Sequence, residues 1–296
     1  MCTIQPNQSS FYKKIPLLFN TLTNDHLFTL GTILYSNTTS TIYNSTHHLL
    51  GKVVVKVIPP EYKDKAQYEL YFLSKVQGHL YFPVVLDTWI SNGTWYIAMK
   101  EMDGTLLELL SGGMNRIEKK QCITQLLEAI SFLHEEKKII HFDLKPENIG
   151  YICHRDGTLT FTILDMCHAE YIENVQLDWY QEQIKTGEIE NTSLWHRSYE
   201  AYGLSVFPIT EKVDVWSIGC IIYELVAGTP LFMDIKDTST YIDILTCMKK
   251  GLKIVKEYHT NDPELRVLEY VMKNCLETNL LFRKSASELH LLLKDS

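Results

Sequence analysis

The chain contains 296 residues, and 28 lysines and arginines against 36 aspartates and glutamates give it a formal net charge of −8 at pH 7. Hydrophobic residues make up 45% and charged residues 22%, which is typical of a globular protein and excludes both a disordered chain and a membrane-embedded bundle. The acidic balance argues against nucleic acid or an anionic membrane surface as the main partner. The 14 glycines are about seven fewer than average usage predicts.

The seven cysteines are spread along the chain without a Cys-x-x-Cys pair, which indicates reduced thiols in a reducing compartment. Two Cys-His neighbours, Cys153-His154 and Cys167-His168, do not indicate zinc, because adjacent strand residues point to opposite faces. The first residues lack the pattern of a signal peptide, and no apolar run approaches the roughly 18 residues of a membrane span. We therefore expect an intracellular monomer, in the cytoplasm or nucleus, or in the host cell if the chain is viral.

The amino-terminal third has the composition of a β-rich region. Short runs of β-branched and aromatic residues at 41–43, 53–58 and 95–99 are bounded by polar residues or by glycine and proline, which predicts strands. Residues 61–76 instead show the spacing of an amphipathic helix.

The rest of the chain is mainly helical in its pattern. Residues 117–134 carry an apolar stripe at steps of three and four, and residues 213–225 are apolar on all sides, which predicts a central buried helix. Residues 241–293 alternate helices with short loops. Between the helical blocks, residues 149–164 are predicted to form a hairpin that turns at 155–158.

These patterns predict an α+β fold in which a β-rich small lobe precedes an α-helical large lobe. We place the two lobes at residues 26–103 and 104–296, after an amino-terminal extension of residues 1–25. Both lobes then belong to a single domain of residues 26–294.

The strongest chemical signal is the segment HFDLKPEN, residues 141–148, between a predicted helix and the predicted hairpin. It combines a carboxylate in Asp143, a cation in Lys145 and an amide in Asn148. Phosphoryl transfer needs such a set, because an acid accepts the hydroxyl proton, a lysine steadies the γ-phosphate and an amide oxygen binds a metal. Asp165, at the end of the hairpin's second strand, is placed to bind the bridging Mg²⁺.

A second candidate set lies upstream, where Lys56 ends the apolar run VVVK and Glu69 lies midway along the following helix. Because burying an unpaired lysine is costly, we expect Glu69 to pair with Lys56 and orient it for nucleotide phosphates. Taken alone, Lys56 is equally compatible with a surface lysine at a strand end, and Glu69 with a solvated helix charge.

With these segments in this order, the sequence resembles the eukaryotic protein kinase family over nearly the whole chain. HFDLKPEN is similar to the catalytic loop of that family, LDMC to its metal-binding DFG segment, and VVVK to the strand with the nucleotide-binding lysine. SLWHRSYE (193–200) resembles the end of the activation segment, and DVWSIGC (214–220) resembles the helix that anchors the catalytic loop. Arg283 matches a late arginine that pairs with Glu200.

The resemblance implies a bilobal kinase-like fold and a reaction that uses ATP and Mg²⁺ to phosphorylate a protein substrate. It implies that Asp143, Lys145 and Asn148 are catalytic, and that Asn148 and Asp165 hold the metal. For the nucleotide it implies contacts from Leu34, Ile42, Lys56, Glu69, Met99, Glu101 and Met102.

The resemblance also narrows the branch. Lys145, two residues after Asp143, fits serine/threonine-specific members, and Ser193 stands where such kinases keep a threonine that hydrogen bonds these two groups. SLWHRSYE is similar to the cyclin-dependent-kinase and related branch, in which the arginine matching Arg197 shapes a pocket for proline after the target residue. Proline direction and a regulatory partner protein are therefore further hypotheses.

The phosphate-covering loop departs from the family, which carries Gly-x-Gly-x-x-Gly before a valine. With Ile42 at the valine position, Tyr35, Asn37 and Ser40 replace the three glycines. We expect their amides to approach phosphates less closely, with hydroxyl groups and the left-handed tolerance of Asn37 compensating in part. Using Gly31 as a loop glycine needs a longer strand pair and is the less favoured alignment.

Further positions also differ from the family. Phe142 stands where an arginine reads an activation-loop phosphate, so we expect no switching by that phosphate. Cys167 replaces the glycine of DFG and is expected to stiffen the backbone. Around the expected adenine site, Val54 replaces an alanine above the ring and Gly150 replaces a leucine below it. These changes predict a bulkier wall above the adenine (the ceiling), a less bulky wall below it (the floor) and an altered ATP affinity.

Two functions follow from these observations. The first is an active serine/threonine protein kinase, because every charged group that the transfer needs is present. The second is a pseudokinase that uses the fold as a scaffold or decoy, which the glycine-free loop, Cys167 and Gly150 favour. A small-molecule kinase is disfavoured, because SLWHRSYE suits peptide docking.

Overall fold

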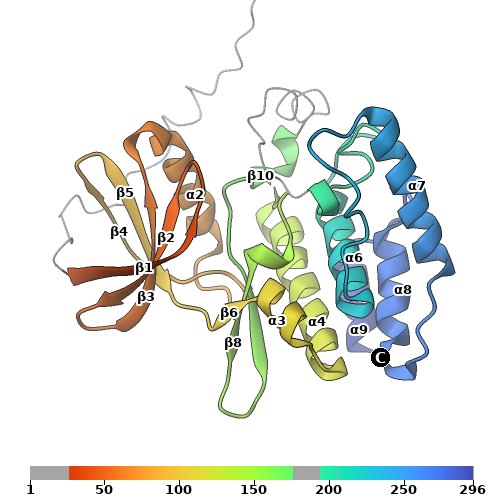
Figure 1. The fold of residues 1–296 in the computed structure, drawn as a ribbon, viewed down its shortest axis with the longest axis horizontal. Coiled ribbons are helices and arrows are strands. Elements are labelled where there is room, and N and C mark those ends of the chain that lie inside the picture. Colours follow the sequence, from red (N-terminus) through yellow and green to blue (C-terminus); the bar gives the residue numbers. More distant parts are fainter. Residues whose placement is uncertain (1–26, 176–193, 206, 296) are drawn as a thin grey trace, which may run out of the picture. The chain divides into compact units, whose positions relative to one another are not determined.

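The computed structural model describes residues 27–175, 194–205 and 207–295. They form two compact units, of which the first ends at Glu101 and the second begins at Met102 (Figure 1). Ser193 and the amino-terminal extension lie outside the described residues. The predicted lobe boundary between residues 103 and 104 stays a prediction.

The amino-terminal unit is built on an antiparallel five-stranded sheet in the order β1-β2-β3-β5-β4. Its strands are β1 (Phe28–Ser36), β2 (Thr41–His47), β3 (Gly51–Ile58), β4 (Val85–Ser91) and β5 (Thr94–Lys100). The predicted strands correspond to β2, β3 and β5. Strand β1 has no counterpart among them, because it is exposed beyond its first residue and shows no alternating burial.

Helix α2 (Lys63–Val76) covers one face of this sheet and follows a short 3-10 turn (Pro60–Tyr62), close to the predicted helix at 61–76. Its Ala66 and Leu70 pack with Ile58 of β3 and with Ile97 of β5. The opposite face carries a separate apolar cluster that consists of Phe28, Val53, Val55, Trp89 and Ala98. Lys56 has the same parity as Ile58 and therefore points to the face that α2 covers.

The carboxy-terminal unit is mainly helical. Its helices are α3 (Leu106–Gly112), α4 (Arg116–Phe132), α6 (Lys212–Ala227), α7 (Tyr241–Glu257), α8 (Arg266–Cys275) and α9 (Ala286–Lys294). Helix α6 is buried along most of its length, as predicted, and it packs against α4 and α8, while α9 packs against α4 (Figure 1). The sequence predicted this core because apolar residues occupy nearly every position of α6.

The carboxy-terminal unit also contains two small sheets. The three strands β6 (Gly104–Thr105), β8 (Ile149–Cys153) and β9 (Leu159–Ile163) form one sheet, and β7 (Ile139–Ile140) pairs with β10 (Glu170–Tyr171) in another. Strands β8 and β9 are the predicted hairpin. Its turn closes through a hydrogen bond from His154 N to Thr158 O of 2.8 Å, with Gly157 at a φ of 83°.

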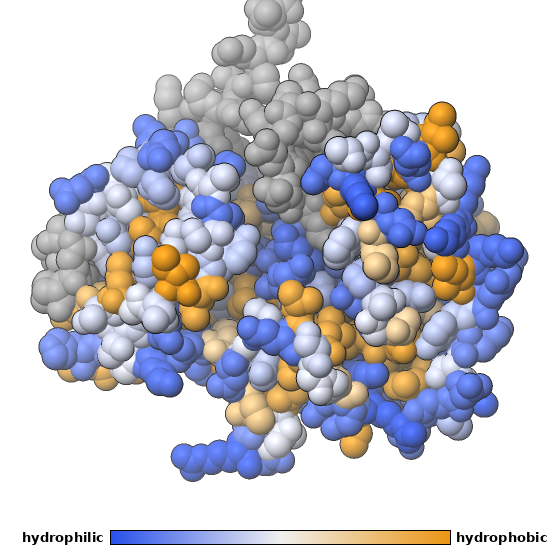
Figure 2. Space-filling model, in the orientation of Figure 1, coloured by the Kyte–Doolittle hydropathy of each residue, from blue (hydrophilic) through white to orange (hydrophobic). Residues whose placement is uncertain are grey.

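The surface of the carboxy-terminal unit is largely hydrophilic on the face shown in Figure 2, including the protruding tip of the β8–β9 hairpin, with small apolar areas between polar ones. Among the described residues, no helix has the length and apolar composition that crossing a lipid bilayer requires.

Candidate active site

The amino-terminal unit contains a buried ion pair. Lys56 Nζ lies 2.7 Å from Glu69 Oε1, and the two residues are only 6% and 3% exposed. Lys56 comes from β3, and Glu69 comes from the buried face of α2, which is fixed by the packing of Leu70 and Phe72. The structure therefore brings together the two residues that the sequence predicted to pair. The ammonium group is held in a dry environment, where its charge acts strongly on a nearby anion.

The carboxy-terminal unit contains the second charged set. Asp143 Oδ2 accepts hydrogen bonds from Lys145 Nζ and from Asn148 Nδ2, both at 2.8 Å. Asn148 Nδ2 also donates to the Asp143 carbonyl oxygen at 2.9 Å, so the amide oxygen of Asn148 is the atom left for a cation. Burial would by itself lower the pKa of Lys145, but attraction to Asp143 and the hydrogen bond to its carboxylate outweigh this effect and raise the pKa. Lys145 is therefore charged at neutral pH.

The loop that carries these groups is held in place by one buried carboxylate, that of Asp214. Asp214, fully buried in α6, accepts from the backbone amides of His141 at 2.8 Å and Phe142 at 2.9 Å. His134 Nε2 lies 2.9 Å from the same carboxylate. A carboxylate with several hydrogen-bond donors is well compensated for burial. Asp214 thus fixes the position of the loop, which is the structural role that the sequence predicted for it.

His141 completes this anchor as a neutral ring. Its Nδ1 accepts a hydrogen bond from the amide of Asp143 at 3.2 Å, which places the ring proton on Nε2. Burial lowers the pKa of His141 and outweighs the attraction of Asp214, Asp143 and Asp165. The ring therefore supports Asp143 without competing for its negative charge.

The hairpin positions Asp165 relative to Asn148. In the register of β8 and β9, Ile149 lies opposite Ile163, and Leu164 N donates to the carbonyl oxygen of Asn148 at 2.8 Å. Asp165 follows directly, and its Oδ1 accepts from Cys167 N at 2.9 Å. The two predicted metal ligands therefore flank neighbouring strand ends. They supply oxygen atoms, which are the ligands that Mg²⁺ prefers.

The other predicted nucleotide contacts lie in different surroundings. Leu34 is 55% exposed and sits at an irregularity of the β1–β2 pairing, while Ile42 is half-buried opposite Lys56. Met99 packs against the apolar cluster under α2. Glu101 ends the first unit and Met102 begins the second.

Gly150 has a close neighbour that the sequence did not predict. A Cβ atom at this position would lie 2.8 Å from Cγ of Met102 and 3.1 Å from Cδ2 of Leu164. The space that a larger residue would fill is therefore already occupied by Met102. The smaller floor expected under the adenine stays a prediction, and the side chain of Met102 is the group that lies beside Gly150.

The turn between β1 and β2 lies at residues 37–40, where the favoured alignment places the phosphate-covering loop. Gly31 instead lies within β1, where an added Cβ would be 2.7 Å from the carbonyl oxygen of Asn44. No residue of the turn has a positive φ; the described non-glycine residues with one are Asn92, Lys138 and Phe142. The Asn37 side chain closes the turn instead, through Oδ1, which accepts from the amides of Thr39 at 2.9 Å and Ser40 at 2.8 Å. An asparagine two residues before a threonine is the sequence signal for such a turn.

Phe142 is buried rather than exposed to a phosphate. It belongs to an apolar cluster with Ile140, Ala201, Ile209 and Val213, against which two further hydrophobic residues pack, Ile172 and Val175. The side chain thus packs the loop of residues 141–148 against segments on both sides of residues 176–193. Its φ of 67° is unfavourable for a bulky residue, and the cluster holds it there.

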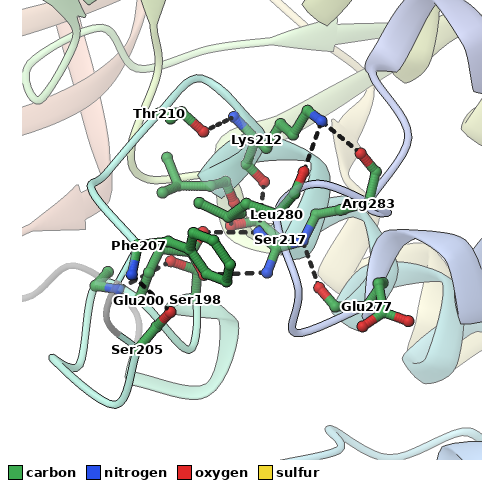
Figure 3. A network of polar contacts seen from close by, with 12 residues as sticks. Ser198, Glu200, Ser205, Phe207, Thr210, Lys212, Ser217, Glu277, Leu280 and Arg283 are labelled. Carbon is green, nitrogen blue, oxygen red and sulfur yellow. Dashed lines mark hydrogen bonds and ion pairs between the residues drawn. The ribbon is translucent and has the colours of Figure 1, made fainter.

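The end of SLWHRSYE is fixed by a polar network (Figure 3). Arg283 forms two hydrogen bonds to the Glu200 carboxylate, at 2.7 and 3.0 Å, and both side chains are fully buried. Lys212 Nζ donates to the carbonyl oxygens of Leu280 at 2.8 Å and Arg283 at 2.6 Å. The pairing of Arg283 with Glu200 agrees with the sequence prediction, and a bidentate pair of this kind fixes geometry as well as charge.

Comparison with known proteins agrees with the geometry. The family described as Protein kinase domain matches residues 30–291. The chain is 30% identical to Cell division control protein 2 homolog 3 of Trypanosoma brucei brucei over 209 residues, 68% of this chain and 62% of that protein. It is 29% identical to the liver/testis isoform of the phosphorylase b kinase gamma catalytic chain of Mus musculus over 178 residues, 58% of this chain and 41% of that protein. The match thus spans less than two thirds of these relatives. Because the family match covers most of the sequence, the chain belongs to the protein kinase family.

Proposed function

We propose that the chain is a serine/threonine protein kinase, which transfers the γ-phosphate of ATP to hydroxyl groups of a protein substrate. The observation that carries this proposal is the charged set on one loop, in which Lys145 and Asn148 both hydrogen bond to the Asp143 carboxylate. Family membership supports it, and both relatives named above carry kinase or cell-division-control names.

In this proposal each group has one task. Asp143 accepts the proton of the substrate hydroxyl, and Lys145 neutralises charge that develops on the transferred phosphoryl group. Lys56, oriented by Glu69, binds the nucleotide phosphates. Asn148 and Asp165 would hold Mg²⁺ through their side-chain oxygens, and the bound ion would supply positive charge to the nucleotide phosphates.

The test is transfer of labelled phosphate from ATP, in the presence of Mg²⁺, to a basic protein. We expect incorporation on serine or threonine, and Asp143→Asn should reduce the rate by about 100-fold or more, because the amide cannot accept the proton. Asp237→Asn changes an exposed carboxylate in the same unit and should leave the rate unchanged. On β3, Lys56→Met should abolish transfer, whereas Lys52→Met, at an exposed position of the same strand, should not.

A second candidate function is a scaffold that binds a partner without phosphoryl transfer. The closed β1–β2 turn favours it, because amides that could bind phosphates already donate to the Asn37 side chain. A protein that incorporates no label and shows no thermal shift with Mg·ATP would support the scaffold and contradict the kinase.

A further inference from the structure

The tip of the β1–β2 hairpin is closed by hydrogen bonds to a single side chain, that of Asn37. Asn37 Oδ1 accepts three hydrogen bonds of good length, from Thr39 N at 2.9 Å, from Ser40 N at 2.8 Å and from Thr39 Oγ1 at 3.1 Å. Asn37 N in turn donates to the carbonyl oxygen of Ser40 at 3.0 Å. Of the four amides of residues 37–40, those of Asn37, Thr39 and Ser40 therefore donate within the turn.

Such convergence of donors on one oxygen is the arrangement by which loops bind an anion. Successive backbone amides that point inward form a concave site for a phosphate oxygen, and a hydroxyl group commonly adds a further donor. Here the same donors meet an uncharged amide oxygen of the chain itself. The turn is thus already bonded as an anion-binding loop would be, with the Asn37 side chain in the place of the anion.

We propose that Asn37 is an internal substitute for a nucleotide phosphate, so that a phosphate must displace its side chain before it can bind the turn. This inference rests on the proposed function and names the residue that sets how strongly the phosphates are held. Its physical basis is that a ligand gains little when it only exchanges one hydrogen bond for another. The nucleoside part of the ligand does not contact these amides and keeps its affinity.

The inference predicts that removing the hydrogen bonds of the Asn37 side chain raises the affinity for Mg·ATP. Asn37→Ala removes the acceptor and leaves the amides of Thr39 and Ser40 for the phosphate, so the Kd for Mg·ATP should fall by about 3- to 10-fold. The Kd for adenosine, which lacks phosphates, should stay the same. Asn37→Asp keeps the acceptor and adds a negative charge, so it should raise the Kd for Mg·ATP and again leave adenosine unaffected.

The measurement is isothermal titration calorimetry of the full chain with Mg·ATP and with adenosine. Asn92→Gly is the matched control, because Asn92 lies in the exposed β4–β5 turn of the same sheet at a φ of 49°, which glycine adopts readily. It should change neither Kd. Thermal unfolding of each variant shows that the sheet is intact, and the aspartate variant tests the inference even if Asn37→Ala destabilises the turn.

The possible outcomes distinguish a failure of the role of Asn37 from a failure of the proposed kinase function. A ratio of adenosine Kd to ATP Kd that is unchanged or lower in Asn37→Ala would overturn the role of Asn37, while the kinase assignment stands on its own assay. Absence of binding for both ligands, in wild type and in every variant, would overturn the proposed function and this inference with it.

Discussion

At Gly150, the space that a side chain would need is occupied by a neighbouring residue, Met102. The position is the second residue of β8, where the resemblance implies a leucine under the adenine. In the structure, Met102 and Leu164 occupy the space that a Cβ atom would need, at 2.8 and 3.1 Å. A flexible methionine side chain suits such an irregular gap.

Restoring a leucine at this position should therefore destabilise the protein. Gly150→Leu overpacks the contact with Met102 and should lower the free energy of unfolding by about 1 to 3 kcal/mol, as measured in urea. Adding Met102→Ala should recover most of this loss, because the two substitutions share one space. Gly112→Leu is the control, since an added Cβ there meets no atom within 4 Å. Strict additivity of the Gly150 and Met102 substitutions would contradict the contact.

At the scale of elements, the loop of residues 141–148 is held by packing on one side and by hydrogen bonds on the other. Asp214 of α6 binds the amides of His141 and Phe142, and the Phe142 ring packs against Ala201 and Ile209. Phe142 is held there by apolar contacts, which need no charged partner.

The left-handed backbone of Phe142 gives a sharp test of this arrangement. Phe142→Ala should cost about 3 to 5 kcal/mol, because it empties the cluster. Phe142→Gly should cost no more, since glycine avoids the roughly 1 to 2 kcal/mol that a side chain adds at positive φ. Phe161, buried in β9, is the control: there glycine should be worse than alanine. Urea unfolding of the four variants measures both differences, and a glycine penalty at position 142 like that at 161 would contradict the model of strain.

At the scale of the molecule, the reactivity of the cysteine thiols measures how tightly the core of the carboxy-terminal unit is packed. Cys122, Cys220 and Cys275 are buried in the carboxy-terminal unit, and burial raises the pKa of each of them. Only the thiolate reacts, so these three positions should be protected. Cys153, exposed at the end of β8, should react with iodoacetamide much faster.

Mass spectrometry of the native protein after brief alkylation checks this pattern. In urea above the unfolding transition, all four positions should be modified at similar rates, which serves as the internal control. Modification of Cys220 or Cys275 in native buffer would mean that α6 and α8 are not packed as described.

The parts of this fold that the sequence predicted are those in which a local pattern determines the outcome. Amphipathic spacing predicted the helix, and the cost of burying an unpaired lysine predicted that Glu69 pairs with Lys56. The short spacing within residues 141–148 keeps Asp143 and Asn148 within reach of each other. Strand β1 escaped prediction because both its faces are largely exposed. Contacts between distant residues, such as Met102 with Gly150, depend on how the chain returns to itself, which periodicity does not encode.

The ion pair of Glu200 and Arg283 has a consequence for how the protein is made. The two residues are separated by 83 positions, and neither is accessible to water once they pair. On the ribosome, Glu200 emerges well before its partner, and burying an uncompensated carboxylate is too costly. We therefore expect the segment that carries Glu200 to stay exposed to solvent until Arg283 has been synthesised, so that this ion pair forms late.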